Sequence, residues 1–176
     1  KMNWNKVALE NKQFVEDILI GKKYHKVKLG CISTYNCRCG IASYTKHLFE
    51  FIPDKIFLFT PISEKSNNNI MDNHQIIPSW SIDSEEDDFS FLIDKIKSIN
   101  ITSLVIQFNF SFFNFDRFSN LIMLLSQCGV DIILIMHSTR APENNKFKNL
   151  TKLIYCLKYC DRILSINNGS VKEINL

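Results

Sequence analysis

The sequence predicts an α/β fold in which a doubly wound, mostly parallel sheet is covered by helices. Two observations carry this prediction. Short apolar strand patterns alternate with helix patterns along most of the chain. One strand pattern, residues 130–136, is almost entirely apolar, which is typical of a central parallel strand covered on both faces.

Residues 3–78 contain the patterns of two helices and three strands. The apolar residues of segment 3–20 fall on one helical face and predict an extra N-terminal amphipathic helix. Apolar alternation over residues 27–32 predicts the first strand, and the apolar spacing of residues 41–49 predicts the first crossover helix. A second strand is predicted at residues 55–60, and a polar loop separates it from a short third strand near residues 75–78.

The second half continues the alternation. An acidic run at residues 83–88, which we expect to be solvated, precedes a helix pattern at residues 89–99, and acidic side chains favour a helix N-terminus. Residues 103–108 predict the fourth strand. Residues 118–128 predict the next helix, which Gly129 closes.

After the central strand at residues 130–136, helix and strand patterns continue to alternate. Residues 147–157 have helical spacing, and residues 162–166 predict a last strand. Ser170 and Glu173 form a plausible capping box for a further helix.

Composition limits the size and the partners of the protein. A chain of 176 residues suits one compact domain, and its hydrophobic fraction of 45% is ordinary for a globular protein. The formal net charge of +3 is too small to indicate a nucleic-acid partner. No apolar run reaches the roughly 18 residues that span a bilayer. We therefore expect a cytoplasmic globular domain that does not bind nucleic acid.

The six cysteines do not have the spacing of a metal site. Cys37-x-Cys39 and Cys156-x-x-x-Cys160 lack the paired spacing of zinc knuckles, and a chain with its own core does not need disulfides. We expect reduced thiols and no bound metal.

Each predicted strand end carries side chains that form hydrogen bonds. These ends are residues 33–36, Gln107, Asn109, residues 137–140, Asn167 and Asn168. Ligands of open parallel sheets bind beyond the carboxyl ends of the strands. The pattern therefore predicts a cleft for a polar ligand at this edge.

His137 is the strongest single candidate at that edge. An imidazole at the end of a buried strand can bind a sugar hydroxyl, meet a phosphate or carry a proton, and backbone groups can also satisfy it. Gln107 and Asn109 can only form hydrogen bonds, which suits recognition of a sugar or an acceptor, or capping of their own strand ends.

The segment 30–44 joins a strand to a helix through a polar, glycine-containing loop. Unpaired backbone N–H groups at such a helix N-terminus bind anions. Arg38 suits bidentate binding of a phosphate, and it equally suits an exposed loop. The sequence has no G-x-G-x-x-G, no P-loop and no G-x-S-x-G motif, while a Cys37 or Cys39 nucleophile acting with His137 stays open.

Several of these stretches together resemble a known family, the retaining, group 1-like glycosyltransferases of the GT-B fold, in its N-terminal Rossmann-like half. The residues that carry the resemblance are Ser33-Thr34-Tyr35-Asn36, Arg38-Cys39-Gly40-Ile41-Ala42-x-Tyr44, Val105-Ile106-Gln107-Phe108-Asn109-Phe110, Met136-His137-Ser138-Thr139 and Cys160-Asp161-Arg162-Ile163-Leu164. Many members have Gly-Gly where this chain has Cys39-Gly40, and His where it has Asn109.

The resemblance implies a role for each stretch. The loop of Arg38, Cys39, Gly40 and Ile41 approaches the donor diphosphate or the reaction centre, and His137 is the catalytic residue beside the transferred sugar. The acceptor-binding residues are Tyr44, Gln107, Asn109, Ser138 and Thr139.

The resemblance also implies the organisation of the protein. Residues 26–176 form the acceptor-side domain, the donor-binding C-terminal domain is absent, and this fragment alone is expected to be inactive. Residues 1–22 are expected to be the tail of an upstream glycosyltransferase module, or an ordinary extension.

The expected activity is metal-independent transfer from a nucleotide-diphosphate sugar, without a cofactor. The acceptor is a cell-envelope glycan or lipid-linked molecule at the inner membrane face, with peripheral membrane contact. A non-catalytic Rossmann-like binding or assembly domain is the alternative, and a flavodoxin-like nucleotide-binding domain is a third.

Overall fold

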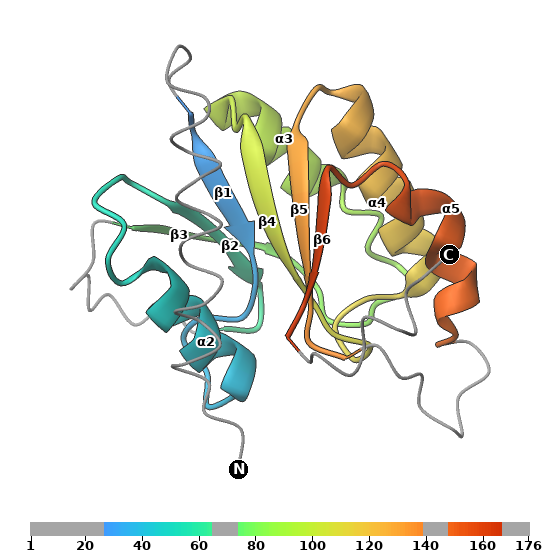
Figure 1. Ribbon diagram of the computed structural model, residues 1–176, viewed down its shortest axis with the longest axis horizontal. Coiled ribbons are helices and arrows are strands. Elements are labelled where there is room, and N and C mark those ends of the chain that lie inside the picture. The colour runs from blue at the N-terminus through green and yellow to red at the C-terminus, as the bar shows by residue number, and fades with distance from the viewer. Residues whose placement is uncertain (1–26, 65–73, 139–147, 167–176) are drawn as a thin grey trace.

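The computed structural model describes residues 27–64, 74–138 and 148–166, which form a six-stranded sheet with helices on both faces (Figure 1). Every pair of neighbouring strands is parallel. The elements in chain order are β1 (Leu29–Ile32), α2 (Gly40–Phe49), β2 (Phe57–Pro61), β3 (Gln75–Trp80), α3 (Ser90–Ile99), β4 (Ser103–Phe108), α4 (Phe115–Gln127), β5 (Asp131–Met136), the 3-10 helix η1 (Leu150–Leu153), α5 (Ile154–Leu157) and β6 (Arg162–Ser165). The predicted α/β class is thus confirmed.

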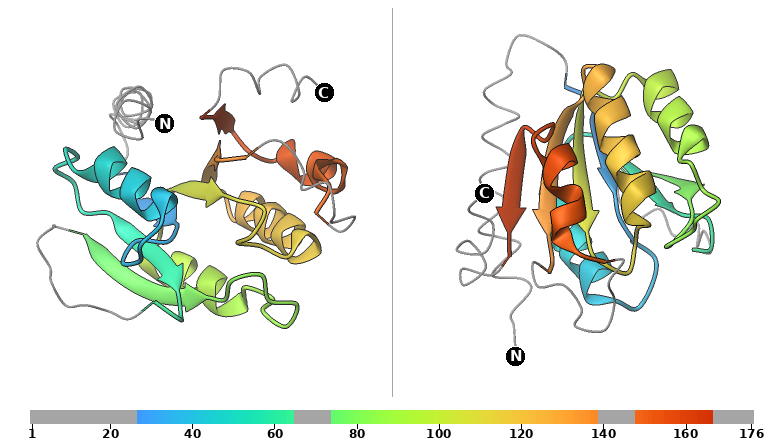
Figure 2. Two further views of the ribbon diagram at one scale, coloured as in Figure 1. Left: turned by 90° about the horizontal axis from the view of Figure 1, so that it is seen from below. Right: turned by 90° about the vertical axis from the view of Figure 1, so that its right-hand side faces the viewer.

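The strand order is β3-β2-β1-β4-β5-β6, the order of a Rossmann-like, doubly wound sheet. The chain steps from β1 through α2 to β2 in one direction, whereas α3, α4 and α5 connect strands in the other direction. Right-handed crossovers then place α2 on one face of the sheet and α3, α4 and α5 on the other (Figure 2). The direction changes between β1 and β4, so the ligand crevice of this fold lies beyond their carboxyl ends.

The side chains of the central strand β4 alternate between the two faces of the sheet. In β4, Leu104, Ile106 and Phe108 belong to the core beneath α3 and α4, while Val105 belongs to the core beneath α2. Successive side chains of a strand point to opposite faces, so Gln107 lies on the α2 face with Val105. In the register, Gln107 lies beside Ile135 of β5.

Helix ends follow local side-chain chemistry. The Asn114 side chain accepts hydrogen bonds from the backbone N–H groups of Asp116 and Arg117, at 3.1 and 3.2 Å, and so begins α4 at Phe115. The predicted start, residue 118, came three residues too late because this cap precedes the apolar spacing. Gly129 follows α4 with φ of 72°, as predicted for the residue that ends this helix.

Two other boundaries differ from the prediction. Phe89 is not the first residue of α3 but its N-cap, with φ of 60°, so the helix begins at Ser90. The helix predicted at residues 147–157 is divided in its described part into η1 and α5. The Asn149 side chain accepts from the N–H of Thr151 at 3.0 Å, which starts the tighter 3-10 turn.

The acidic run is mostly exposed, as expected, since Asp83, Glu85, Glu86 and Asp88 lie at the surface and Asp87 is half-buried. Asp83 also forms a salt bridge with Lys148, a buried residue whose ammonium group donates to the carbonyls of Phe110 and Phe113 at 2.8 Å. Asp87 accepts from the N–H of Ser81, within the same β3–α3 connection, at 2.6 Å. Through Asp83 the run thus joins this connection to the segment of Lys148, which a local charge pattern does not reveal.

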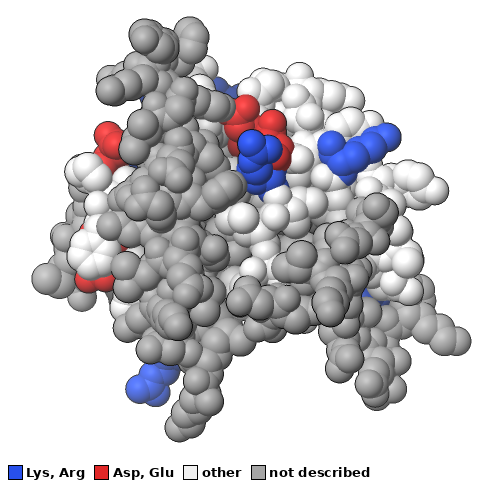
Figure 3. All heavy atoms as spheres, in the orientation of Figure 1, with Lys and Arg blue, Asp and Glu red and all other residues white. Residues whose placement is uncertain are grey.

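Some predictions fall outside the described residues. These are the helix at residues 3–20, the capping box at Ser170 and Glu173, and the polar ends at Thr139, Arg140, Asn167 and Asn168. On the face drawn in Figure 3, described charged side chains of both signs are scattered among uncharged ones.

Candidate functional site

Five buried polar residues lie at the carboxyl end of the sheet on its α2 face. We call them the polar layer: Ser33, Thr45, Thr60, Gln107 and His137. Four of them stand at strand ends, each two residues after a side chain of the core beneath α2, so strand alternation places them on the same face as that core. The fifth, Thr45, belongs to α2 itself. Of the strand-end residues that the sequence predicts, Ser33, Gln107 and His137 therefore lie on the same face of the sheet.

Gln107 and His137 form the closest contact in the polar layer. Oε1 of Gln107 lies 2.5 Å from Nε2 of His137, and the two residues stand at the ends of the adjacent strands β4 and β5. The ring of Tyr44, from α2, meets the imidazole edge to face at 4.9 Å. The structure thus joins three of the residues that the sequence singled out.

Burial determines the charge of this imidazole. It lowers the pKa of His137 from 6.5 to about 4, so the ring is neutral near pH 7. A neutral imidazole has one N–H, and an amide oxygen facing Nε2 places that proton on Nε2. His137 is therefore held in one orientation and one tautomer, suited to hydrogen bonding more than to carrying a positive charge.

The amide nitrogen of Gln107 is a buried hydrogen-bond donor. Gln107 is fully buried, and its Nε2 has no hydrogen-bond partner among the described residues. Leaving a buried donor unsatisfied costs about 1–3 kcal/mol. Such an atom beside His137 is where a ligand oxygen, or a water, would stabilise the protein.

The loop after β1 already binds a carboxylate. Glu64, which follows β2, accepts hydrogen bonds from the backbone N–H groups of Tyr35 and Asn36 at 3.1 Å. Successive backbone N–H groups that converge on one anion form an anion-binding nest. This nest is filled by Glu64 of the chain itself, and binding of a ligand anion at the N-terminus of α2 stays a prediction.

Glu64 is a residue that sequence reasoning missed. It lies in a stretch with the composition of a polar loop, and 28 residues separate it from Asn36. The contact of Ser33 with Thr45 was also not predicted: their hydroxyl oxygens lie 2.7 Å apart and tie the end of β1 to α2. Nothing in the local sequence signals either pairing.

The four predicted loop residues lie at the start of α2 with different exposures. Arg38 and Gly40 are exposed, Cys39 is half-buried, and Ile41 packs into the core on the α3 side. Cys39 is the N-cap of α2, and its sulfur accepts from the N–H of Ala42 at 3.3 Å. Arg38 is therefore placed to meet a ligand from solvent, while Ile41 anchors the loop.

The remaining predicted residues lie next to this group. The amide oxygen of Asn109 accepts from the N–H and the hydroxyl of Ser111, at 2.9 and 2.7 Å, so it shapes its own loop. Ser138 is half-buried directly after His137, and Thr139 lies outside the described residues. Whether Asn109 and Ser138 bind an acceptor stays a prediction.

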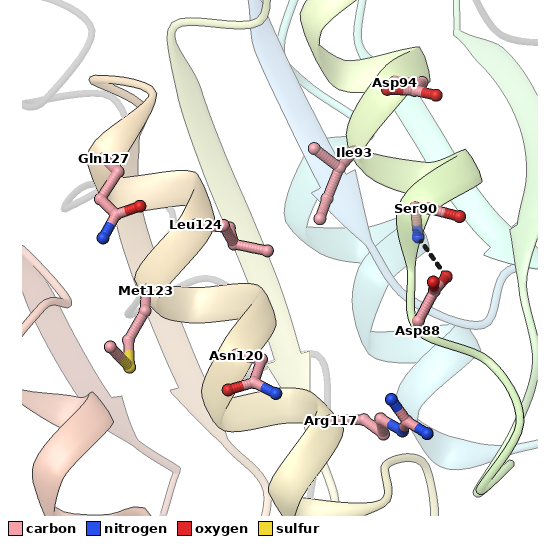
Figure 4. Close-up of a pocket in the computed structure, with 9 residues that line it drawn as sticks. All are labelled: Asp88, Ser90, Ile93, Asp94, Arg117, Asn120, Met123, Leu124 and Gln127. Atoms are coloured by element: carbon pink, nitrogen blue, oxygen red, sulfur yellow. Dashed lines mark hydrogen bonds between the residues drawn. The ribbon is translucent and has the colours of Figure 1, made fainter.

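Two surface grooves lie on the opposite face of the sheet. One, of about 440 Å³, runs between α3 and α4 and includes Asp88, Arg117 and Leu124 (Figure 4). The N–H of Ser90 donates to Asp88 at 2.9 Å and, together with the charge of Arg117, lowers the pKa of that carboxyl. The other, of about 490 Å³, lies at the N-terminus of α4. Neither groove is lined by a residue that the sequence predicted as functional.

Within the described residues, no three His, Cys, Asp or Glu side chains gather so that they could hold a metal ion. No helix in those ranges is long and apolar enough to cross a membrane. Comparison of the chain with models of protein families, with curated proteins and with solved structures gives no match.

Proposed function

We propose that this chain is the acceptor-side, Rossmann-like domain of a nucleotide-sugar-dependent glycosyltransferase of the GT-B kind. The observation that carries the proposal is the Gln107–His137 pair on the crevice side of the sheet. It lies next to the strand-order switch point, where this fold binds ligands. Glu64 fills the nest at Tyr35 and Asn36, so the anion site of this proposal is the start of α2, which follows the same loop. A sugar joined to a diphosphate needs hydrogen-bonding groups and an anion site side by side.

In this proposal His137 acts by hydrogen bonding. A ring with a pKa of about 4 is neutral under physiological conditions, and Gln107 fixes its orientation, so it positions a hydroxyl of the transferred sugar. Backbone N–H groups of the loop at Arg38 and Gly40 would stabilise the negative charge of the departing diphosphate. This division of labour needs no metal ion.

The proposed reaction requires a second domain. In the GT-B arrangement the donor is held mainly by another Rossmann-like half, and transfer takes place between the two. The chain of 176 residues should therefore lack transfer activity, and the acceptor should be a cell-envelope glycan or lipid-linked molecule reached at the inner membrane face.

The decisive experiment uses the protein extended by the coding sequence beyond Leu176. We expect a second Rossmann-like half there, and transfer from one of a panel of nucleotide-diphosphate sugars. His137→Ala should lower kcat about 100-fold, because a preorganised hydrogen bond at the reacting sugar is lost. The matched control is His47→Ala, which removes a surface histidine of α2 and should leave kcat unchanged.

Two outcomes would count against the proposal. Wild-type turnover in His137→Ala would discard the role of this residue, and transfer by the 176-residue chain alone would contradict the two-domain requirement. A nucleotide that binds the isolated chain tightly, without a second half in the longer protein, would favour a nucleotide-binding domain instead.

A further inference from the structure

Two cysteines are brought together by a tight turn at the start of α2. The backbone N–H of Cys39 donates to the carbonyl of Cys37 at 3.0 Å, which closes a three-residue turn around Arg38. Arg38 is not among the described residues with positive φ, so this is the common inverse γ-turn. The two sulfur atoms lie 3.5 Å apart. A disulfide needs Cα atoms roughly 4.4–6.8 Å apart, and a turn closed over three residues keeps them within that range.

The pair is accessible, unlike two of the other thiols in the described part of the chain. Cys37 is exposed and Cys39 is half-buried, whereas Cys31 and Cys156 are buried; Cys128 is exposed and Cys160 is half-buried. Burial raises the pKa of Cys31 and Cys156, and it raises that of Cys160 to about 12. A small oxidant in water therefore reaches the pair before it reaches these thiols.

The hydrogen bonds assign different roles to the two sulfurs. The thiol of Cys37 donates to the sulfur of Cys39, which also accepts from the N–H of Ala42 and lies 3.1 Å from the hydroxyl of Thr34. Partial burial, then the hydrogen bond and charge of Cys39, raise the pKa of Cys37 to about 12. Cys37 thus keeps its proton, and Cys39 is the sulfur on which donors converge.

We propose that Cys37 and Cys39 form a reversible dithiol–disulfide pair that a peroxide oxidises, with Cys39 as the attacking sulfur and Cys37 as the resolving one. The Cys39 thiolate attacks one peroxide oxygen; an S–O bond forms, the O–O bond breaks, and hydroxide leaves and takes up a proton. The Cys37 sulfur then attacks the sulfenic sulfur of Cys39; the S–S bond forms, the S–O bond breaks, and the thiol proton of Cys37 passes to the leaving hydroxyl group, which departs as water. A dithiol reductant restores both thiols.

This assignment does not rest on the proposed glycosyl transfer. It does place an oxidation-sensitive bond in the loop that caps α2 and precedes Gly40. In the disulfide, the thiol proton of Cys37 is lost and residue 37 is tied to the N-cap residue.

The test treats the reduced 176-residue chain with hydrogen peroxide, blocks remaining thiols with N-ethylmaleimide and digests without reductant. Cleavage after Tyr35 and Tyr44 yields a peptide, residues 36–44, that contains both sulfurs. We expect this peptide to carry no maleimide and to weigh less than the reduced peptide by two hydrogen atoms. Dithiothreitol should restore two reactive thiols. Recovery of the peptide with two maleimides, while exposed Cys128 is oxidised, would overturn the proposal.

Three variants separate the roles of the sulfurs. In Cys37→Ser, peroxide should leave a sulfenic acid on Cys39 that dimedone traps. In Cys39→Ser, which keeps a hydroxyl cap on α2, Cys37 should stay reduced. Cys128→Ser is the matched control and should form the disulfide as the wild type does. Dimedone on Cys37 in Cys39→Ser, at the rate found for Cys39, would overturn the assignment of the attacking sulfur.

Discussion

The two faces of the sheet carry different kinds of core. Beneath α3, α4 and α5 the core is larger, and we call this side the aromatic face because a cluster of aromatic rings packs among its aliphatic side chains: Phe59, Trp80, Phe89, Phe108, Phe110, Phe112, Phe113, Phe115 and Phe118. Beneath α2 the core is smaller, its aromatic residues are Tyr35, Tyr44 and Phe49, and the polar layer adjoins it at the carboxyl end.

The difference separates the part of the molecule that supplies stability from the part where we propose the chemistry. The aromatic face gains its free energy from burial and ring packing, and the one indole N–H in it is satisfied by the carbonyl of Phe59 at 2.9 Å. The α2 face keeps buried polar groups, among them the amide nitrogen of Gln107, which has no hydrogen-bond partner within the described part of the chain. Such costly groups are found where proteins bind a ligand, a water or an ion, or where they react. Substitutions on the two faces should therefore have different consequences.

The largest effect is expected in the aromatic core. Phe113 is fully buried, and its ring lies 4.7 Å from that of Phe118 and 5.2 Å from that of Trp80. Phe113→Ala should lower the free energy of unfolding in urea by about 3–5 kcal/mol, because it removes burial and leaves a cavity. Phe91→Ala, at an exposed site of α3, is the control and should change it by less than about 0.5 kcal/mol. Equal losses of unfolding free energy in the Phe113 and Phe91 variants would contradict the idea that packing of the buried rings stabilises this face.

The next effect distinguishes the polar layer by its response to pH. Between pH 6.5 and about 4 the unfolded chain binds a proton that native His137 does not, so stability must fall as the pH falls through this window. The loss should be about 2 kcal/mol at pH 5. Unfolding in urea at pH 7 and pH 5 measures it. His137→Gln should show a smaller loss than the wild type, and His47→Gln should match the wild type; an unchanged loss in His137→Gln would refute the assignment.

The smallest effect is local to one helix of the aromatic face. Asn114→Ala removes the cap that accepts from the N–H groups of Asp116 and Arg117, and should cost about 1 kcal/mol. Asn114→Ser should recover most of it, because a hydroxyl can accept the same bonds. Thermal unfolding monitored by circular dichroism distinguishes the two. A serine variant as unstable as the alanine variant would show that Asn114 does not stabilise α4 by capping its N-terminus.

The sequence by itself determined where the strands of the described sheet lie and which polar residues stand at their ends. Apolar periodicity along the chain located every strand of the described sheet, and the boundaries of β4 agree with the prediction because each residue from Ser103 to Phe108 is buried in a single run. It also placed His137, Gln107 and the loop at Arg38 at strand ends, since a strand end is a local property. Capping by Asn114 and the break between η1 and α5 escaped it because they depend on individual side chains outside the apolar pattern.

Only the tertiary structure decided which of these strand ends meet. Nothing local specifies that β1 lies beside β4, that the Gln107 amide reaches an imidazole 30 residues away, or that Glu64 fills the anion nest at Tyr35 and Asn36. Those contacts arise because the helices bury the apolar faces of all the strands together, and the strand order that achieves this then selects the polar neighbours. Local apolar spacing specifies whether a segment forms a helix or a strand. Which segments then pack side by side is specified only by the packing of the whole domain.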